Sequence, residues 1–377
     1  MPNVFTGDLF SNLWLAQRIN TMPYVPTFFG EMNLFNDRVD GVNAEQMFTN
    51  SMANGINSKT VSIRRENGTL MVLPTEARGS MPTYNVRDKI CDVPFLVPYI
   101  PKNDDIRWDD IIGTTLYGNP RPGTGELDPE TATMAVERVL KRIKYEYILT
   151  WEYHRLGAVK GLIMDADGQQ TVLDLYKAFQ IEQIDSAGNT TPGVYGPRQI
   201  TYTNSLAEVS EAIVSHVGDV LGSMMPGEIG CVVGADFFTK IQDEVQLRDA
   251  FDRYKDGEFR RTSYDNMPYQ RGPNTGFHYR GVTYYRYRGN LQTQDKDNPV
   301  KTPFVANDRG HTFVRGTDRY SRYNAPGTCE DAVGKLGIPI YVTRQDKDFK
   351  KGIDFHAESC PLFMNGQPEM NVEVIVA

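Results

Sequence analysis

The sequence predicts an α+β fold. Helical and strand-like segments follow one another along its 377 residues without the regular strand–helix–strand alternation of a parallel sheet. Residues 128–156 have the pattern of a long amphipathic helix, and the second half of the chain is rich in strand patterns. About a hundred residues before the helix are extended, aromatic and without a core of their own. These features predict an elongated subunit that needs partners, and so a building block of an assembly.

The long helix has a well-defined start. Asp128 is a good N-cap residue, Pro129 suits the first helical position, and Glu130 favours the positive end of the helix dipole. Apolar residues then recur at steps of three and four, which places them on one stripe. The stripe consists of Val136, Val139, Leu140, Ile143, Tyr147, Trp151 and His154. At 1.5 Å per residue the helix is about 40 Å long, which makes it a spine for the subunit.

The segments before the helix are short and lack an obvious core. Residues 7–20 are expected to form a helix, and 21–35 is apolar but broken by proline. One side of this first helix would carry Leu9, Leu13, Trp14 and Ile19. Residues 59–73 alternate like a β-hairpin whose turn is Asn67-Gly68, and the chain from 74 to 100 stays extended. An isolated hairpin is marginally stable in water, so we expect neighbouring subunits to hold these segments; packing on their own domain is the alternative.

The part of the chain after the helix alternates between strands and helices. Strands are expected at 160–164 and 171–176, on either side of a turn at Asp165-Ala166-Asp167-Gly168. Ser205 and Glu208 have capping-box spacing and open a helix over 205–221. The remaining predicted elements are a buried strand at 228–234, a helix at 235–251, and strands at 277–288, 303–314, 337–343, 354–364 and 370–376.

Composition excludes several classes of protein. The net charge of −8 argues against a generic nucleic-acid binder, which would be basic over its contact face. No stretch reaches the roughly 20 apolar residues of a membrane span, and the first residues lack the layout of a signal peptide. The four cysteines are far apart, so we expect reduced core thiols rather than a disulfide or zinc framework. They are Cys91, Cys231, Cys329 and Cys360.

Sequence motifs of enzymes are missing. The chain has no phosphate-binding G-x-x-x-x-G-K-[ST] motif, no H-E-x-x-H zinc motif and no G-x-S-x-G elbow. Gly123-Thr124-Gly125 lacks the third glycine of a dinucleotide site. Asp165–Gly168 resembles half a calcium loop but lacks the position-five ligand and the terminal Glu, which favours a plain turn. We expect His154 to be a packing histidine rather than a base, and Cys360 to be a core residue rather than a nucleophile paired with His356. No catalytic residue, metal ligand or cofactor is predicted.

Arginine and tyrosine are concentrated between residues 252 and 288. This pair of residue types suits contacts between proteins, where both are enriched at hot spots, or stacking on single-stranded nucleic acid. Acidic residues such as Asp252 and Glu258 lie among them and weaken a phosphate-binding groove. We favour an intersubunit contact, with an ordinary exposed face and a nucleic-acid site as the alternatives.

Taken in order, these elements resemble the lambda-type major capsid proteins of tailed phages, the phage major capsid protein E family. The aromatic opening is similar, and it comprises Tyr24-Val25-Pro26-Thr27-Phe28-Phe29 and Leu34-Phe35. The extended region with Ala77-Arg78-Gly79 and Tyr84, followed by the stretch Asn119–Gly125 and the long helix, also matches the family's order. The strongest similarity is at the end, in Asp354–Ser359, Pro361–Met364 and Asn371–Ala377, although Cys360 and Phe363 depart from the family's segment.

The resemblance implies the tailed-phage capsid fold of the Hong Kong phage type. On this chain it implies an N-terminal arm, an extended β-hairpin loop, a peripheral domain with the spine helix 128–156, and an axial domain. The implied boundaries are 1–56 for the arm, 57–100 for the extended loop, 101–200 for the peripheral domain, 201–325 for the axial domain, 326–355 for the return to the peripheral domain and 356–377 for the C-terminal strands.

The function implied by the resemblance is that of a major capsid protein. Its copies would assemble in the host bacterial cytoplasm into hexamers and pentamers, which form the icosahedral head around double-stranded DNA without reading its sequence. Other partners would be a portal and, because Met1 is present, a separate scaffold protein, with a decoration protein left open. Intersubunit contact candidates are Trp14, Phe28, Phe29, Asn67, Gly68, Arg78, Tyr84, Arg260, Arg261, Tyr284, Arg286, Asp346 and Lys347.

Two other interpretations remain open from the sequence. An encapsulin-like compartment has the same fold and would enclose a cargo enzyme instead of DNA. A soluble nucleic-acid-binding protein would use the segment 252–288. Particle formation separates both shells from the third class, and the content of the particles separates the two shells.

Overall fold

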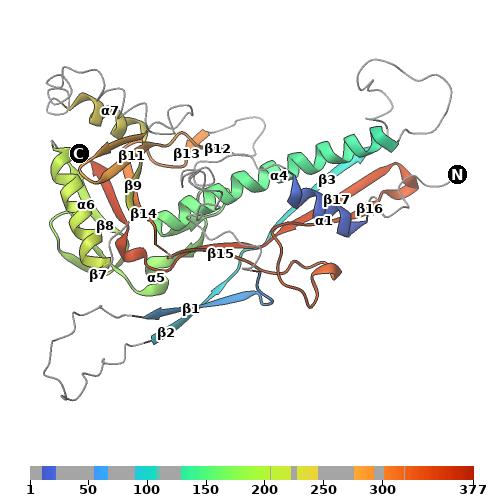
Figure 1. Cartoon of the computed structure of the whole chain (residues 1–377), viewed down its shortest axis with the longest axis horizontal. Helices are drawn as coiled ribbons and strands as arrows, with labels where there is room; N and C mark the ends of the chain where they lie inside the picture. The colour runs from blue at the N-terminus through green and yellow to red at the C-terminus, as the bar shows by residue number, and fades with distance from the viewer. Residues whose placement is uncertain are drawn as a thin grey trace, which may run out of the picture.

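The computed structural model has the α+β fold expected from the sequence. It describes residues 11–22, 55–66, 90–107, 109, 129–203, 205–221, 227–244, 276–292, 301–317 and 319–377. The body is elongated: a six-stranded sheet with two helices forms one end, a three-stranded sheet forms the other, and one long helix joins them (Figure 1). Within the described residues, no helix is both long and apolar enough to cross a membrane.

The larger sheet is mixed, and its strands come from distant parts of the chain. The order is β10-β11-β9-β14-β19-β8, with parallel pairs at β11–β9 and β19–β8 and antiparallel pairs elsewhere. The strands are β8 (Arg198–Tyr202), β9 (Glu228–Val233), β10 (Gly276–Tyr279), β11 (Val282–Arg286), β14 (Arg309–Arg315) and β19 (Val372–Val376). The C-terminal strand β19 therefore lies inside the sheet, between β14 and β8.

Helices α6 (Leu206–Leu221) and α7 (Ala235–Asp243) pack against this sheet. The Tyr284 ring on β11 contacts Phe237 of α7 edge-on, and its hydroxyl lies 2.8 Å from that of Ser210 in α6. Helix α7 ends earlier than the predicted residue 251, because Glu244 turns away and its carboxylate accepts hydrogen bonds from the Leu206 N–H and the Tyr202 hydroxyl. The carboxylate thus helps to cap α6 from another element.

Helix α4 (Pro129–Lys160) confirms the predicted spine. It begins at the predicted Pro129, continues four residues beyond the predicted end, and is about 48 Å long at 1.5 Å per residue. All predicted stripe residues are buried or, for Val139, packed against the core. Its C-terminal end meets the large sheet, and its N-terminal half supports the smaller one (Figure 1).

The smaller sheet lies along the N-terminal half of α4. Its order is β16-β17-β3, formed by β16 (Tyr341–Asp346), β17 (Gly352–Ser359) and β3 (Ile100–Arg107). On the face toward α4, Ile106, Ile353 and Phe355 are buried, and Asp104 is paired with Arg142 of α4. The opposite face is polar, as in many antiparallel sheets that have one face on the core and the other toward solvent. Because Cys360 interrupts the pairing, the strand predicted over 354–364 is two strands, β17 and β18 (Pro361–Asn365).

The first helix differs from the prediction in its packing. Helix α1 (Asn12–Thr21) packs on α4 and β16 of its own subunit, so neighbouring subunits are not needed to hold it. Leu15 and Ile19 are buried, whereas Leu13 is 63% exposed, which corrects the predicted face. Leu9 lies outside the described residues.

The contact between α1 and α4 is polar at the C-terminal end of α1. The Lys144 ammonium donates hydrogen bonds to the carbonyls of Ile19 at 2.9 Å and Met22 at 2.5 Å. Carbonyls at the end of a helix lack partners within the helix, so this buried lysine satisfies them from α4. Arg18 adds two hydrogen bonds to Glu137, at 2.9 and 2.5 Å.

The predicted hairpin over 59–73 is wrong. Strand β1 (Thr60–Glu66) pairs antiparallel with β2 (Ile90–Leu96), with Thr60 opposite Leu96 and Glu66 opposite Ile90. The two strands therefore close around residues 67–89 rather than around a tight turn at Asn67-Gly68, which lies outside the described residues. This β1–β2 ribbon projects from the body (Figure 1). Val61 and Phe95 are buried in a small core with residues of α5 (Leu175–Phe179) and β18, and Ile63 and Val93 pack against that core.

Shorter elements complete the described part of the chain. The pair β4 (Leu162–Met164) and β5 (Thr171–Asp174) confirms the turn at 165–168, and the predicted strand over 277–288 is the hairpin β10–β11. Strand β16 lies a few residues later than the predicted 337–343. The other elements are α5 (Leu175–Phe179), β6 (Glu182–Ile184), β7 (Thr190–Tyr195), β12 (Asn290–Gln292), β13 (Lys301–Pro303), β15 (Tyr320–Asn324) and the 3₁₀ turns η5 (Glu330–Ala332), η6 (Asp348–Lys350) and η7 (Pro368–Met370).

Removing the Lys144 ammonium should release α1 from the spine. In K144M the side chain keeps its length but leaves the carbonyls of Ile19 and Met22 without their donor, so we expect a loss of about 1–3 kcal/mol in the free energy of unfolding. Hydrogen exchange by mass spectrometry should show faster exchange in residues 11–22. The control is K141M, which changes an exposed lysine of the same helix. Equal protection of α1 in both variants would contradict this account.

Candidate functional site

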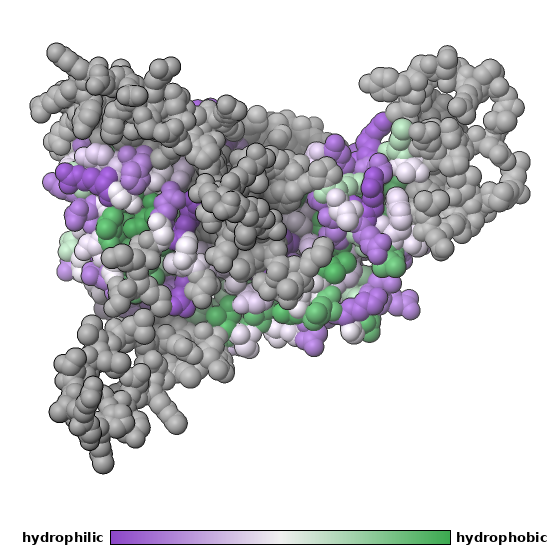
Figure 2. All heavy atoms as spheres, viewed as in Figure 1, coloured by the Kyte–Doolittle hydropathy of each residue, from purple (hydrophilic) through white to green (hydrophobic). Residues whose placement is uncertain are grey.

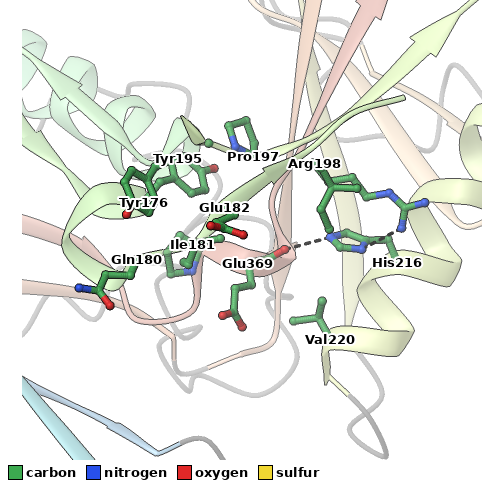
Figure 3. A pocket seen from close by; sticks show the side chains of 13 residues that line it. Tyr176, Gln180, Ile181, Glu182, Tyr195, Pro197, Arg198, His216, Val220 and Glu369 are labelled. Carbon is green, nitrogen blue, oxygen red and sulfur yellow. Dashed lines mark hydrogen bonds between the residues drawn. The ribbon is translucent and has the colours of Figure 1, made fainter. Parts of the chain in front are cut away.

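A hollow with a volume of about 510 Å³ lies where β8, α6 and η7 meet (Figure 3). Its lining includes Tyr195, Pro197, Arg198, His216, Val220 and Glu369. His216 joins three elements here, because its Nδ1 lies 3.0 Å from the Arg198 guanidinium and its Nε2 lies 2.9 Å from the Glu369 carbonyl oxygen. Since the guanidinium can only donate, Nδ1 is the acceptor and Nε2 carries the proton.

His216 serves as a structural joint in this arrangement. Burial lowers the pKa of its imidazole, and the neighbouring Arg198 charge lowers it further, although the hydrogen bond to the Glu369 carbonyl acts the other way. Both ring nitrogens are engaged, so neither faces the hollow as a free base. The hollow thus has the geometry of a junction between helix, strand and 3₁₀ turn.

A second hollow, of about 700 Å³, runs beside the outer face of α4. Much of its lining is apolar, with Tyr99, Leu149, Tyr153, Val172 and Phe304 among the contributing residues. Leu149 is 55% exposed, and Tyr145, one turn before it, is also exposed. These two residues are four apart on α4 and lie outside its buried stripe. The spacing is visible in the sequence, but we did not predict an exposed apolar pair from it. Apolar residues also lie along the lower edge of the body in the view of Figure 2.

A buried carboxylate accepts several hydrogen bonds on the polar face of the three-stranded sheet. Glu358 accepts hydrogen bonds from the Thr328 N–H at 2.6 Å, from the Thr328 hydroxyl at 2.5 Å and from the Tyr99 hydroxyl at 3.1 Å. Burial alone would raise the pKa of the Glu358 carboxyl, but the hydrogen bonds from Thr328 and His356 outweigh it and lower the pKa. This network ties the loop after β15 to β17 and to the chain before β3. Its members are distant in sequence, and no local pattern of residues indicates it.

The structure places the predicted contact residues in different environments. Trp14 is half-buried against the core, Asp346 is exposed, and Lys347 forms ion pairs with Asp105 and with Asp354 at 3.2 Å. Tyr284 is 0% exposed inside its own subunit, so its prediction as a contact residue is wrong. The residues outside the described part are Phe28, Phe29, Asn67, Gly68, Arg78, Tyr84, Arg260 and Arg261.

The same burial changes the interpretation of the tyrosine- and arginine-rich segment. Tyr284, Tyr285 and Tyr287 lie in the core, where they cannot stack on nucleic-acid bases, and Arg286 is half-buried. The strand alternation over these residues already indicated buried positions, and composition misled the prediction. Residues 251–275 of the segment lie outside the described part.

The residues examined for catalysis behave as structural ones. Burial raises the pKa of the Cys360 thiol to about 11 and lowers the pKa of His154 to about 4, so both stay neutral near pH 7. Asp167 caps its turn by accepting hydrogen bonds from the N–H groups of Gln169 and Gln170. Within the described ranges, no three His, Cys, Asp or Glu side chains are grouped to hold a metal ion.

Comparison with known proteins gives one family match. The sequence profile of the family described as phage major capsid protein E matches residues 14–376. No curated protein matches the chain.

Several solved phage capsids are similar to this chain at low identity. The cyanophage Pam1 capsid is 11% identical over 88% of this chain and 89% of its own, with a TM-score of 0.46. The mature capsid of bacteriophage PhiM1 is 11% identical over 85% and 82%, with a TM-score of 0.43. The capsid of Ralstonia phage GP4 is 7% identical over 88% of each chain, with a TM-score of 0.44. The assignment of this chain to a family rests on the family match alone.

Acidification should destabilise the subunit through its buried histidines. His154 titrates near 6.5 when unfolded but at about 4 when folded, so the unfolded chain binds the additional proton between these values and stability falls as the pH drops through this window. Lowering the pH from 7 to 5 should cost about 2 kcal/mol at this site.

Thermal unfolding as a function of pH tests this expectation. The H154Q variant should show a smaller loss between pH 7 and pH 5 than the wild type, whereas H278Q, which replaces an exposed histidine, should keep the full loss. An unchanged pH dependence in H154Q would be evidence against a neutral, buried His154.

Proposed function

Because this chain belongs to the phage major capsid protein E family and is therefore a structural protein of the phage head, we propose that the β1–β2 ribbon and the outer face of α4 join its copies in the shell. Major capsid proteins of tailed phages form icosahedral heads, typically from hexamers and pentamers. The elongated body and its projecting ribbon suit that task. The observation that carries the proposal is the ribbon, a two-stranded sheet in which β1 and β2 pair with no third strand among the described residues.

The exposure of the ribbon supports its role as a contact. At the base of the ribbon, Leu96 is 72% exposed on one face, whereas its neighbours Val61 and Phe95 are buried on the other. Two strands alone are marginally stable in water, so a long ribbon requires a surface to lie on. A neighbouring copy provides such a surface at every position of a closed shell.

The outer face of α4 is a suitable receiving surface. Leu149 and Tyr145 are apolar and exposed there, beside the hollow lined by Tyr99 and Val172. Obligate assemblies typically bury roughly 2,000–5,000 Å² per interface. A thin subunit reaches such an area by combining a ribbon, a helix face and the segments at its ends. The implied boundaries at 56, 100, 200, 325 and 355 remain part of this proposal.

The chemistry of the described residues supports a structural rather than a catalytic role. The protonated Cys360 thiol and the doubly engaged His216 are poorly suited to nucleophilic or base chemistry. We further propose assembly in the bacterial cytoplasm with a portal and a separate scaffold protein. The net charge of −8 supports an inner face that encloses double-stranded DNA without binding it tightly.

Excising the segment between β1 and β2 tests the role of the ribbon. Glu66 pairs with Ile90, so replacing residues 67–89 by Asn-Gly should close a two-residue hairpin and leave the body intact. We expect the wild type to form shells, and the excised variant to remain as folded subunits or small oligomers in sedimentation velocity and negative-stain images.

The thermal midpoint of unassembled subunits is the control for folding and should be unchanged. Normal shells from the excised variant would refute the role of this segment. A wild type that forms no shells with its scaffold present would refute the proposal as a whole, and particles that contain a cargo protein instead of DNA would favour a compartment.

A further inference from the structure

The turn between β16 and β17 presents an exposed aromatic ring. Phe349, in η6, is 90% exposed, more than any other large hydrophobic residue described. Its backbone is left-handed, with φ 59° and ψ 18°. The turn lies at the end of the elongated body where α4 begins, away from the six-stranded sheet (Figure 1).

Both properties of Phe349 are unfavourable in a lone subunit. The left-handed region places Cβ close to the backbone, so glycine or asparagine normally occupies it. A phenylalanine ring in water also forgoes the burial that a core would give it. Strained non-glycine residues persist where the surroundings hold them, and they are concentrated at functional positions.

The base of the turn holds Phe349 rigidly. Lys347 forms ion pairs with Asp105 of β3 and, at 3.2 Å, with Asp354 of β17. Its N–H donates to the Gly352 carbonyl at 3.0 Å, and the Lys351 N–H donates to the Asp348 carbonyl at 3.4 Å. The Lys351 ammonium lies 5.7 Å from the centre of the Phe349 ring. The ring thus extends outward from a base that two strands brace, so the backbone of the turn is already ordered before binding.

We propose that Phe349 is an anchor residue that inserts into a second copy of this chain in the assembled shell. This inference rests on the proposed function. In a closed shell of identical elongated subunits, the far end of each body meets other copies of the same chain. Rigid aromatic residues buried at the centre of a contact are the residues that dominate its stability. Insertion removes the exposed ring from water, and the contact offsets the strained backbone.

The first experiment separates strain from contact by comparing variants at Phe349 and at Gln180. F349G and F349N remove the ring and suit the left-handed backbone, so the thermal midpoint of unassembled subunits should stay equal or rise. Shell yield, measured by sedimentation velocity, should fall at least about tenfold. F349Y keeps an aromatic ring and should assemble. Q180G relieves the same backbone conformation (φ 56°) at the end of α5 at a residue that carries no aromatic ring, and should assemble normally.

The second experiment identifies the partner. A photo-crosslinking benzoyl-phenylalanine at position 349 should, in purified shells, crosslink to another copy of the chain, which mass spectrometry of the joined peptides detects. Normal shell yield from F349G and F349N, or crosslinks only to a different protein, would overturn the proposal. So would a loss of shells in F349Y together with a lower thermal midpoint, because that pattern indicates a folding role. Absence of shells in the wild type refutes the proposed function instead.

Discussion

The inner face of α4 is the constraint on which the rest of the subunit depends. At its centre, the Trp151 indole donates a hydrogen bond to the Ser359 hydroxyl at 3.2 Å, and that hydroxyl donates to the Pro339 carbonyl at 2.7 Å. The buried Arg322 guanidinium lies 4.2 Å from the Trp151 ring. One side chain of the spine therefore fixes β17, the loop before β16, and β15. Burying a guanidinium costs free energy of desolvation unless specific contacts compensate for it. This contact therefore favours one arrangement of the strands over others.

Polar contacts at other points of α4 serve the same purpose. Lys144 holds the end of α1, the Tyr147 hydroxyl donates to the Ile100 carbonyl at 3.1 Å, and the Asn371 amide donates to the Val159 carbonyl at 2.6 Å. Each joins the helix to a segment far away in sequence. Apolar packing alone tolerates sliding of a strand along a helix, whereas a hydrogen bond between named atoms does not. The spine thus sets the positions of both sheets.

Local signals predicted the local elements well. The proline and the apolar spacing of α4 lie within one segment, and the structure confirms both, whereas the predicted cap Asp128 lies outside the described residues. The packing of α1 could not be predicted, because Leu15 and Ile19 are buried by residues of α4 and β16 that the sequence does not identify as neighbours. The pairing of β1 with β2 was missed for a related reason, since Asn67-Gly68 is a strong local turn signal and the true partner comes after residue 89. Tyr284 was misplaced because composition was given more weight than alternation.

The β1–β2 register has a further consequence for how such a subunit diversifies. Residues 66 and 90 are paired across the two strands, so the chain between them starts and ends at the same position of the ribbon. The entropy needed to close such an excursion grows only logarithmically, by about 0.6 kcal/mol for each doubling of its length. Insertions or deletions there leave the spine and both sheets untouched. The length of this excursion can therefore change in evolution without a redesign of the core of the subunit.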